Sequence, residues 1–190
     1  MKNIKILMIL LINYVKLILM ENMKDCKVIV CGPAIGKTYL AKQDDRFVDL
    51  DAEKAIYKYG LEGATEFELE NGKFNRAKIV NFDSNDYIIK RLDEELSKGK
   101  IALISFHKKI IDYIHKNNVK YCLVYAGLEL AKEYRERMRL RGNCDKFINE
   151  LTNEEEWKKF YFEHKNNTKP TYKIELKSGE FLSDVVNKFF

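Results

Sequence analysis

An α/β fold built around a parallel sheet is predicted from two features of the sequence. Short apolar runs at residues 28–30 and 101–104 lack the polar–apolar alternation of a half-exposed strand, and such runs are typical of strands buried on both faces. Stretches with helical spacing of apolar residues lie between these runs. Regular alternation of strands and helices favours one parallel sheet with right-handed crossover connections.

Length and composition indicate one soluble globular domain. The chain has 190 residues, of which 46% are hydrophobic and 33% are charged, and this composition excludes a disordered protein. The net charge of +5 is modest, and the charges are interspersed along the chain. This pattern favours a small anionic ligand over nucleic acid as the binding partner.

The four cysteines predict free thiols. Cys31 and Cys122 lie in or beside apolar strands, whereas Cys26 and Cys31 are too far apart for a C-x-x-C zinc knuckle. Free thiols are typical of a reducing compartment, so we expect a cytoplasmic protein.

Residues 1–23 form an extension that precedes the predicted domain. They are mostly apolar, and their lysines fall on one side of a helix at about 100° per residue. One interpretation is an amphipathic helix over residues 1–20 that lies on a membrane surface. The interpretation we favour is that translation begins at Met20 or Met23. A spanning helix would need a longer charge-free run, and a signal peptide would need a small-residue cleavage site.

The stretch KVIVCGPAIGKTYLAK, residues 27–42, has the order strand, glycine-bearing loop and helix start. This order is typical of a phosphate-binding loop, in which backbone N–H groups point at an anion. The Lys37 ammonium would contact the β- and γ-phosphates, and the Thr38 hydroxyl would bind Mg²⁺. Cys31 stands where the full pattern has its first glycine, and the alternative is an ordinary strand–turn–helix junction with a solvated Lys37. The predicted phosphate contacts in the loop are Gly32, Pro33, Ala34, Ile35 and Gly36.

Two acids end the second predicted strand, at residues 46–51. Asp49 and Asp51 are two residues apart, so their side chains share one face of the strand. At the carboxyl end of a parallel strand that face looks into the ligand crevice. One carboxylate would reach Mg²⁺ directly or through water, and the other would hold an acceptor hydroxyl. The alternative is that Asp51 caps a helix over residues 52–59.

The third predicted strand, residues 101–104, follows an amphipathic helix at residues 85–97. Many P-loop proteins carry a metal-binding aspartate directly after this strand, but this chain has Ser105 there. Asp49 is therefore the best candidate for the carboxylate of the metal. His107 lies between this strand and the next helix, at the edge of the sheet where ligands bind. The alternative is a structural histidine.

The stretch LELAKEYRERMRLR predicts an arginine-rich helix. Arg135 and Arg139 are four residues apart, as are Arg137 and Arg141, so each pair stacks on one side of the helix. Arginines stabilise the charge of a phosphoryl group during its transfer, and this helix is therefore a candidate lid. The alternative is a solvated helix with an ion pair between Glu133 and Arg137.

The remaining segments complete the alternation of strands and helices. We expect a helix from His107 to Asn117, a fourth strand at 119–125, short helices at 145–151 and 153–164, and a fifth strand at 172–176. A turn at Ser178 and Gly179 then leads into a closing helix with Phe181, Leu182, Val185, Val186 and Phe189 on its apolar side. Residues 60–84 have no clear pattern. They would form either a cap over an acceptor site or an irregular surface segment.

The order of these motifs resembles a known family. The segments GPAIGKT, VDLDAE, SFHKKIIDYI, VYAGLELAKEYRERMRLRGN and IELKSGEFLSDVV resemble small phage-type P-loop kinases of the nucleoside monophosphate kinase (adenylate kinase-like) class. The resemblance covers residues 24–190. It implies a three-layer P-loop kinase fold with a five-stranded parallel sheet flanked by helices. It also implies ATP, Mg²⁺, phosphoryl transfer to a nucleoside or deoxynucleoside monophosphate, and the host cytosol if the protein is phage-encoded.

The resemblance assigns roles to individual residues. Cys31 and the missing acid after the third strand depart from the family pattern, and they motivate an alternative function as a nucleotide-binding sensor or inhibitor with weak or no turnover. A polynucleotide end kinase is a further alternative, against which the modest charge argues. The predicted catalytic residues are Lys37, Asp49, Arg135, Arg139 and Arg141; Thr38 and Asp49 would hold the metal, and Asp51 and His107 would hold the acceptor.

Overall fold

A five-stranded parallel sheet forms the centre of the protein. The computed structural model describes Ile4, Leu7 and residues 25–52, 57–58, 77–78, 84–143 and 145–186. The strands are β1 (Val28–Cys31), β2 (Phe47–Asp49), β5 (Ile101–Ile104), β6 (Tyr121–Ala126) and β7 (Tyr172–Leu176). Their order is β2-β5-β1-β6-β7, and every neighbouring pair is parallel.

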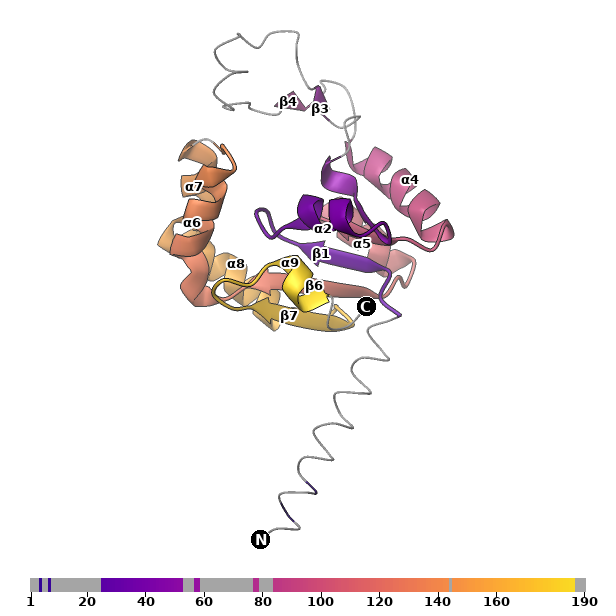
Figure 1. Cartoon of the computed structure of the whole chain (residues 1–190). Helices are drawn as coiled ribbons and strands as arrows, with labels where there is room; N and C mark the ends of the chain where they lie inside the picture. The colour runs from indigo at the N-terminus through magenta and orange to yellow at the C-terminus, as the bar shows by residue number, and fades with distance from the viewer. Residues whose placement is uncertain are drawn as a thin grey trace.

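Helices cover both faces of this sheet (Figure 1). The core cluster on one face of the sheet includes side chains of α2 (Lys37–Gln43), α6 (Ala131–Leu140), α7 (Asp145–Thr152) and α9 (Leu182–Val186). The other face packs against α4 (Ser84–Ser97) and α5 (Lys108–Lys116). Side chains of α8 (Glu154–Asn166) reach both core clusters. The expected three-layer α/β fold is therefore confirmed.

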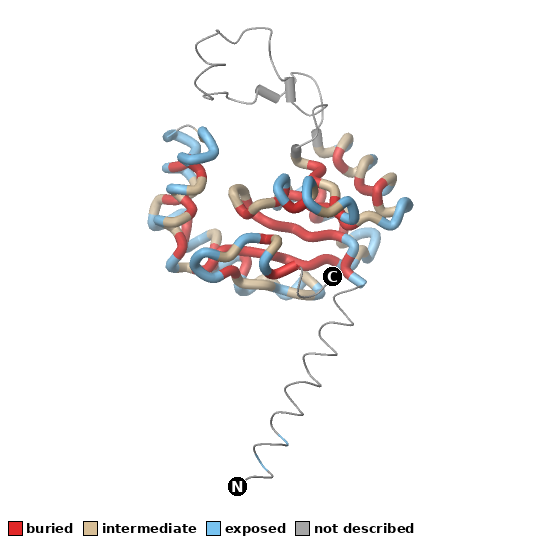
Figure 2. Tube along the Cα trace, viewed as in Figure 1, coloured by how far each residue is buried: buried red, intermediate tan, exposed pale blue. Residues whose placement is uncertain are grey.

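The pattern of burial explains why the central strands are apolar throughout. All residues of β1, β5 and β6 are buried, and Figure 2 shows the buried positions concentrated along the strands in the middle of the molecule. In β1, Ile29 and Cys31 belong to one core cluster, whereas Val28 and Val30 belong to the other. Successive side chains alternate between the two faces, and both faces are covered.

A second, two-stranded sheet was not expected. Tyr57 and Lys58 form β3 (Tyr57–Lys58), which pairs antiparallel with β4 (Ala77–Lys78). The helix predicted for residues 52–59 is therefore wrong at its C-terminal end, because pairing with a strand distant in sequence overrides a weak local helical preference. A 3₁₀ helix spans Leu50–Ala52. Most of residues 60–84 lies outside the described residues, so the interpretation of this segment as a cap over an acceptor site stays a prediction.

The two ends of the chain are described only in part. Within residues 1–23 the structure describes Ile4 and Leu7, which are helical and exposed. In the described part of the chain, no helix has both the length and the apolar character needed to cross a membrane. The membrane-surface helix over residues 1–20 stays a prediction, as does the start at Met20 or Met23.

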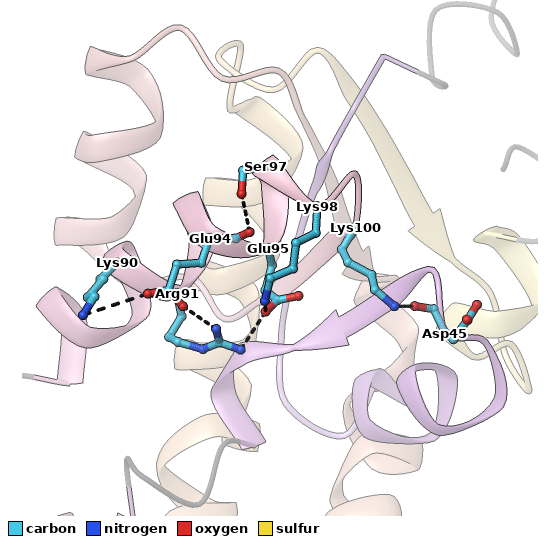
Figure 3. Close-up of polar contacts among 8 residues, drawn as sticks. All are labelled: Asp45, Lys90, Arg91, Glu94, Glu95, Ser97, Lys98 and Lys100. Carbon is cyan, nitrogen blue, oxygen red and sulfur yellow. Dashed lines mark hydrogen bonds and ion pairs between the residues drawn. The ribbon is translucent and has the colours of Figure 1, made fainter.

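Hydrogen bonds and ion pairs between charged side chains stabilise the C-terminal end of α4 (Figure 3). Glu95 is buried, with 6% of its surface exposed. It accepts hydrogen bonds from Lys98 (2.7 Å) and Arg91 (2.8 Å). Lys100 donates to the main-chain carbonyl of Asp45, in the turn before β2. The hydrogen bond from Lys98 and the charge of Arg91 lower the pKa of Glu95, against the effect of burial.

Glu95→Gln is expected to lower the free energy of unfolding at pH 7 by about 1–3 kcal/mol, because it removes hydrogen bonds to a charged group. The pKa of Glu95 is lowered in the folded protein. Its stabilisation is therefore present above the ordinary glutamate pKa of about 4.3 and is lost as the pH falls below it. Urea unfolding from pH 7 to about pH 3 should show a difference in unfolding free energy between wild type and variant that is constant near neutrality and narrows below the ordinary glutamate pKa.

Glu94→Gln is the matched control for this measurement. Glu94 is 40% exposed and pairs with Lys90 and Arg91 on the same helix. Exposed ion pairs contribute little to stability, so Glu94→Gln should lower the free energy of unfolding by less than about 1 kcal/mol. An equal effect of the two substitutions would contradict the assigned role of Glu95.

Candidate functional site

The loop after β1 leads from the central strand into α2 by a sharp turn. It connects the central strand of the sheet to α2, which begins at Lys37. Ala34 and Gly36 have positive φ values of 56° and 101°, a conformation that glycine adopts without steric cost. The backbone N–H of Leu40 donates to the Gly36 carbonyl (3.0 Å), which closes the first turn of α2. The loop therefore turns sharply at the carboxyl end of β1.

The cysteine in place of the first glycine does not obstruct this loop. The Cys31 side chain is 1% exposed and packs in the core cluster with Ile29 and Cys122. Burial raises the pKa of Cys31 to about 12, so its thiol is neutral at pH 7. Cys26, Cys31 and Cys122 are all buried free thiols, as predicted; Cys144 lies outside the described residues.

Lys37 is buried, not solvated. Its side chain is 9% exposed, and its ammonium donates to the carbonyls of Gly32 (3.1 Å) and Cys31 (3.4 Å). It also donates to Ser105 Oγ (3.0 Å) and lies 3.2 Å from Asp51 Oδ2. Burial opposes the charged form, but the nearby carboxylates of Asp51 and Asp49 favour it, and the pKa of Lys37 is raised. The lysine therefore carries its charge at neutral pH.

Thr38 and Asp49 lie side by side at the start of α2 and the end of β2. The Thr38 hydroxyl donates to Asp49 Oδ2 (2.6 Å), and the Asp51 N–H donates to Asp49 Oδ1 (3.2 Å). Burial raises the pKa of Asp49, although the hydrogen bond from Thr38 and the charge of Lys37 oppose this shift. Asp49 is thus placed where the sequence predicted a carboxylate next to the Thr38 hydroxyl.

This pair of oxygen donors fits Mg²⁺. A hydroxyl that gives its proton to a carboxylate still offers its lone pairs to a cation. Among the described residues, no three His, Cys, Asp or Glu side chains gather in a way that could hold a metal alone. Mg²⁺ is commonly held by one or two protein oxygens together with phosphate oxygens. Thr38 and Asp49 match that type of shared site.

Asp51 and Ser105 complete the cluster. The Ser105 hydroxyl donates to Asp51 Oδ2 (2.5 Å) and accepts from Lys37. The other carboxylate oxygen, Asp51 Oδ1, is buried and has no hydrogen-bond partner within the described ranges. Asp51 lies within the 3₁₀ helix and binds Lys37 and Ser105, so capping of a helix over residues 52–59 does not describe it. Ser105 was missed as a site residue; its place directly after a predicted strand was the available signal.

The sheet order brings these side chains together. β1, β5 and β2 are neighbours, and the carboxyl ends of parallel strands meet at one edge of a sheet. Helix α2 starts at the same edge, because it follows β1 directly. The resulting polar cluster, named here the Lys37 cluster, consists of Lys37, Thr38, Asp49, Asp51 and Ser105.

The predicted lid arginines bind elsewhere in this structure. Arg135 donates to the hydroxyl and the carbonyl of Thr152 (both 3.1 Å), and Arg139 pairs with Glu136 (2.6 Å). Arg141 is exposed just after the end of α6. Helices α6 and α7 form an arm on the side of the molecule where the loop after β1 lies (Figure 1). A role for these arginines at the phosphate stays a prediction.

A different arginine links α6 to the loop. The guanidinium of Arg137 lies 3.9 Å from the centre of the Phe181 ring. Phe181 packs on Gly36, where a Cβ would be 3.6 Å from its ring. Arg137 also pairs with Glu133 and donates to the Glu180 carbonyl (2.9 Å). The ion pair with Glu133, which was part of the alternative interpretation of this helix, is confirmed; the contact with Phe181 was not predicted.

His107 lies next to the cluster in the chain. It precedes α5, and its carbonyl accepts the backbone N–H groups of Ile110 and Ile111 (both 3.0 Å). Its own N–H donates to the Ser105 carbonyl (3.0 Å). These contacts are made by the main chain and place His107 at the helix start; a contact of its imidazole with an acceptor stays a prediction.

No protein-family model matches this chain, and no curated protein is significantly similar to it in sequence. The argument for its function therefore rests on the Lys37 cluster and the loop around it. These residues provide a cation, backbone donors and two carboxylates at one edge of the sheet. That combination suits a polyphosphate with a bound divalent cation.

Thr38→Val is expected to weaken binding of inorganic triphosphate in the presence of Mg²⁺ by about tenfold, as is typical when a residue supporting a metal is lost. Binding without Mg²⁺ should change little, because valine keeps the shape of threonine and the Lys37 ammonium remains. Isothermal calorimetry with and without Mg²⁺ measures both values. Thr168→Val, at an exposed position before β7, is the control, and an equal loss with and without the metal would argue against a metal-binding Thr38.

Proposed function

We propose that this protein is an ATP- and Mg²⁺-dependent phosphotransferase acting on a small acceptor. The observation that carries the proposal is the buried Lys37 ammonium, which two carbonyls of its own loop hold at the start of α2. A buried charge is costly and is kept where it has partners or a function. Its place beside Thr38 and Asp49 supports a function in binding phosphates.

The cluster would act mainly by positioning and by charge. The loop N–H groups and Lys37 would bind the β- and γ-phosphates, while Thr38 and Asp49 would hold Mg²⁺, with Asp49 acting directly or through water. The metal supplies positive charge that neutralises the phosphate oxygens. The acceptor oxygen attacks the γ-phosphorus, the bond to the β–γ bridging oxygen breaks, and ADP leaves with the electron pair. Such a transfer needs no covalent intermediate on the protein.

The resemblance favours a nucleoside or deoxynucleoside monophosphate as the acceptor. In that case Asp51 and His107 would orient the acceptor. Arg135, Arg139 and Arg141 would have to leave their present positions and approach the phosphates by movement of the α6–α7 arm. ATP and Mg²⁺ are abundant in the cytosol, which is the compartment where we propose that the protein acts.

A second candidate function is nucleotide binding without turnover. The contacts of Lys37 with Asp51 and Ser105 favour it, since these groups compete with a phosphate for the same ammonium. A sensor or inhibitor would need only the bound nucleotide. ATP binding by calorimetry without phosphoryl transfer to any acceptor, water included, would support this function over the first.

Lys37→Met is expected to reduce ATP affinity by about 10–100-fold, because it removes a charged hydrogen bond worth about 1.5–3 kcal/mol. Calorimetric titration with ATP and Mg²⁺ measures the change, and circular dichroism establishes that the variant is folded. Lys42→Met, an exposed change on the same helix, should leave the affinity unchanged. A folded Lys37→Met variant with wild-type affinity for ATP would refute the proposal.

A further inference from the structure

One oxygen of the Asp51 carboxylate, the second in the cluster, has no hydrogen-bond partner among the described residues. Asp51 Oδ2 is engaged by Ser105 (2.5 Å) and by Lys37 (3.2 Å). Asp51 Oδ1 is shielded from solvent but has no hydrogen-bond partner in the part of the chain that the structure describes. A buried polar atom without a partner costs free energy, and such atoms are rare in native proteins. Among the described residues, none therefore supplies a donor at this position.

The missing donor belongs at the reacting end of the site. Asp51 lies within one hydrogen-bond length of the Lys37 ammonium, which is the group that would contact the γ-phosphate. Ser105 holds the Asp51 carboxylate from the β5 side. A group that donates to Asp51 Oδ1 would therefore lie beside the transferred phosphoryl group, where the acceptor must be.

The charge of the cluster decides which acceptor fits. An ionised carboxylate only accepts hydrogen bonds, and a phosphate monoester at neutral pH carries about −1.5 to −2 charges and also mainly accepts. An acceptor phosphate would thus meet Asp49 and Asp51 as like charges without supplying a proton to Oδ1. Among the arginines of α6, Arg135 binds Thr152, and Arg139 binds Glu136. A hydroxyl, in contrast, donates.

We propose that the acceptor atom is a hydroxyl oxygen, not the phosphate oxygen of a nucleoside monophosphate, and that Asp51 Oδ1 accepts its hydrogen bond. The proposal rests on the phosphotransferase function proposed above. The hydroxyl oxygen forms a bond to the γ-phosphorus of ATP, and the bond between that phosphorus and the β–γ bridging oxygen breaks. ADP takes the electron pair, and the hydroxyl proton passes to Asp51 and then to solvent. The products are a phosphate monoester, ADP and one proton.

Phosphorus NMR of reactions with ATP and Mg²⁺ tests the acceptor class. One set of acceptors holds the common ribonucleoside and deoxyribonucleoside monophosphates. The other holds hydroxyl compounds, namely nucleosides, sugars, polyols and an oligonucleotide with a 5′-hydroxyl end, with water as the smallest member when no acceptor is added. We expect new monoester signals, or inorganic phosphate from water, and no nucleoside diphosphate made from a monophosphate. Transfer to the oligonucleotide with a steep salt dependence would identify nucleic acid ends as the source of the hydroxyl.

Asp51→Asn tests the role of the carboxylate, since it keeps the shape and removes the charge. Transfer to a hydroxyl or to water should fall by about 10²–10⁴-fold, the usual contribution of a group that takes a proton in the transition state. ATP affinity by calorimetry should be equal or tighter, because Lys37 loses a competing partner. Asp112→Asn, at an exposed ion pair on α5, is the control and should change neither quantity.

Ser105→Ala provides a second variant in case Asp51→Asn does not fold. It leaves the Asp51 charge in place but removes the hydroxyl that orients the carboxylate. We expect slower transfer with ATP affinity similar to wild type, because Ser105 is a positioning residue. A loss of ATP affinity equal to the loss of transfer would show a merely structural role and count against the proposal.

Two results overturn the proposal while leaving phosphoryl transfer or ATP binding intact. One is conversion of a monophosphate to a diphosphate at a rate that Asp51→Asn leaves unchanged or raises. The other is a wild-type protein that binds ATP but transfers phosphate to no hydroxyl, water included. Failure of the proposed function is distinct, since it appears as ATP binding that is absent or insensitive to Lys37→Met.

Discussion

The buried charge of Lys37 is the constraint on which the site depends. An ammonium removed from water must be compensated nearby, or the protein is strongly destabilised. Here the compensation comes from the carbonyls of Gly32 and Cys31, from the Ser105 hydroxyl and from the Asp51 carboxylate. These groups lie on β1, directly after β1 and β5, and in the 3₁₀ helix that follows β2, so the charge of Lys37 is compensated where those three strands lie side by side.

In the proposed function, the contacts that stabilise the lysine would also orient it for a ligand. A polyphosphate would bring negative charge to an ammonium that is already oriented at the start of α2, so little reorganisation is needed. Asp51 would then exchange part of its contact with Lys37 for a contact with the acceptor. Thr38, which is exposed although its hydroxyl contacts the buried Asp49, can face a metal and its protein partner at once.

Departures from the sequence pattern are accommodated by packing. Cys31 replaces a glycine, but its side chain points into the core and only its carbonyl faces the Lys37 ammonium. Ser105 replaces an acid, and the carboxylate that stands beside it comes from Asp51, more than fifty positions earlier in the chain. The contact of Arg137 with Phe181 joins α6 to the loop through a residue near the C-terminal end of the chain. Each arrangement depends on residues distant in sequence.

Local patterns in the chain were sufficient to predict the parallel strands, the sharp turn after β1 and the contact of Asp49 with Thr38. Burial on both faces of a strand and a glycine turn can each be recognised from neighbouring residues. They were not sufficient to predict the tertiary contacts that those residues make. Tyr57 and Lys58 were expected in a helix but form a strand. Hydrogen-bonded pairing with a strand distant in sequence outweighs a weak local preference for helix. Only the tertiary structure determined that Ser105 and Asp51 are the partners of Lys37. A buried charge is compensated by the groups of whichever strands become its neighbours, and these strands are distant in sequence.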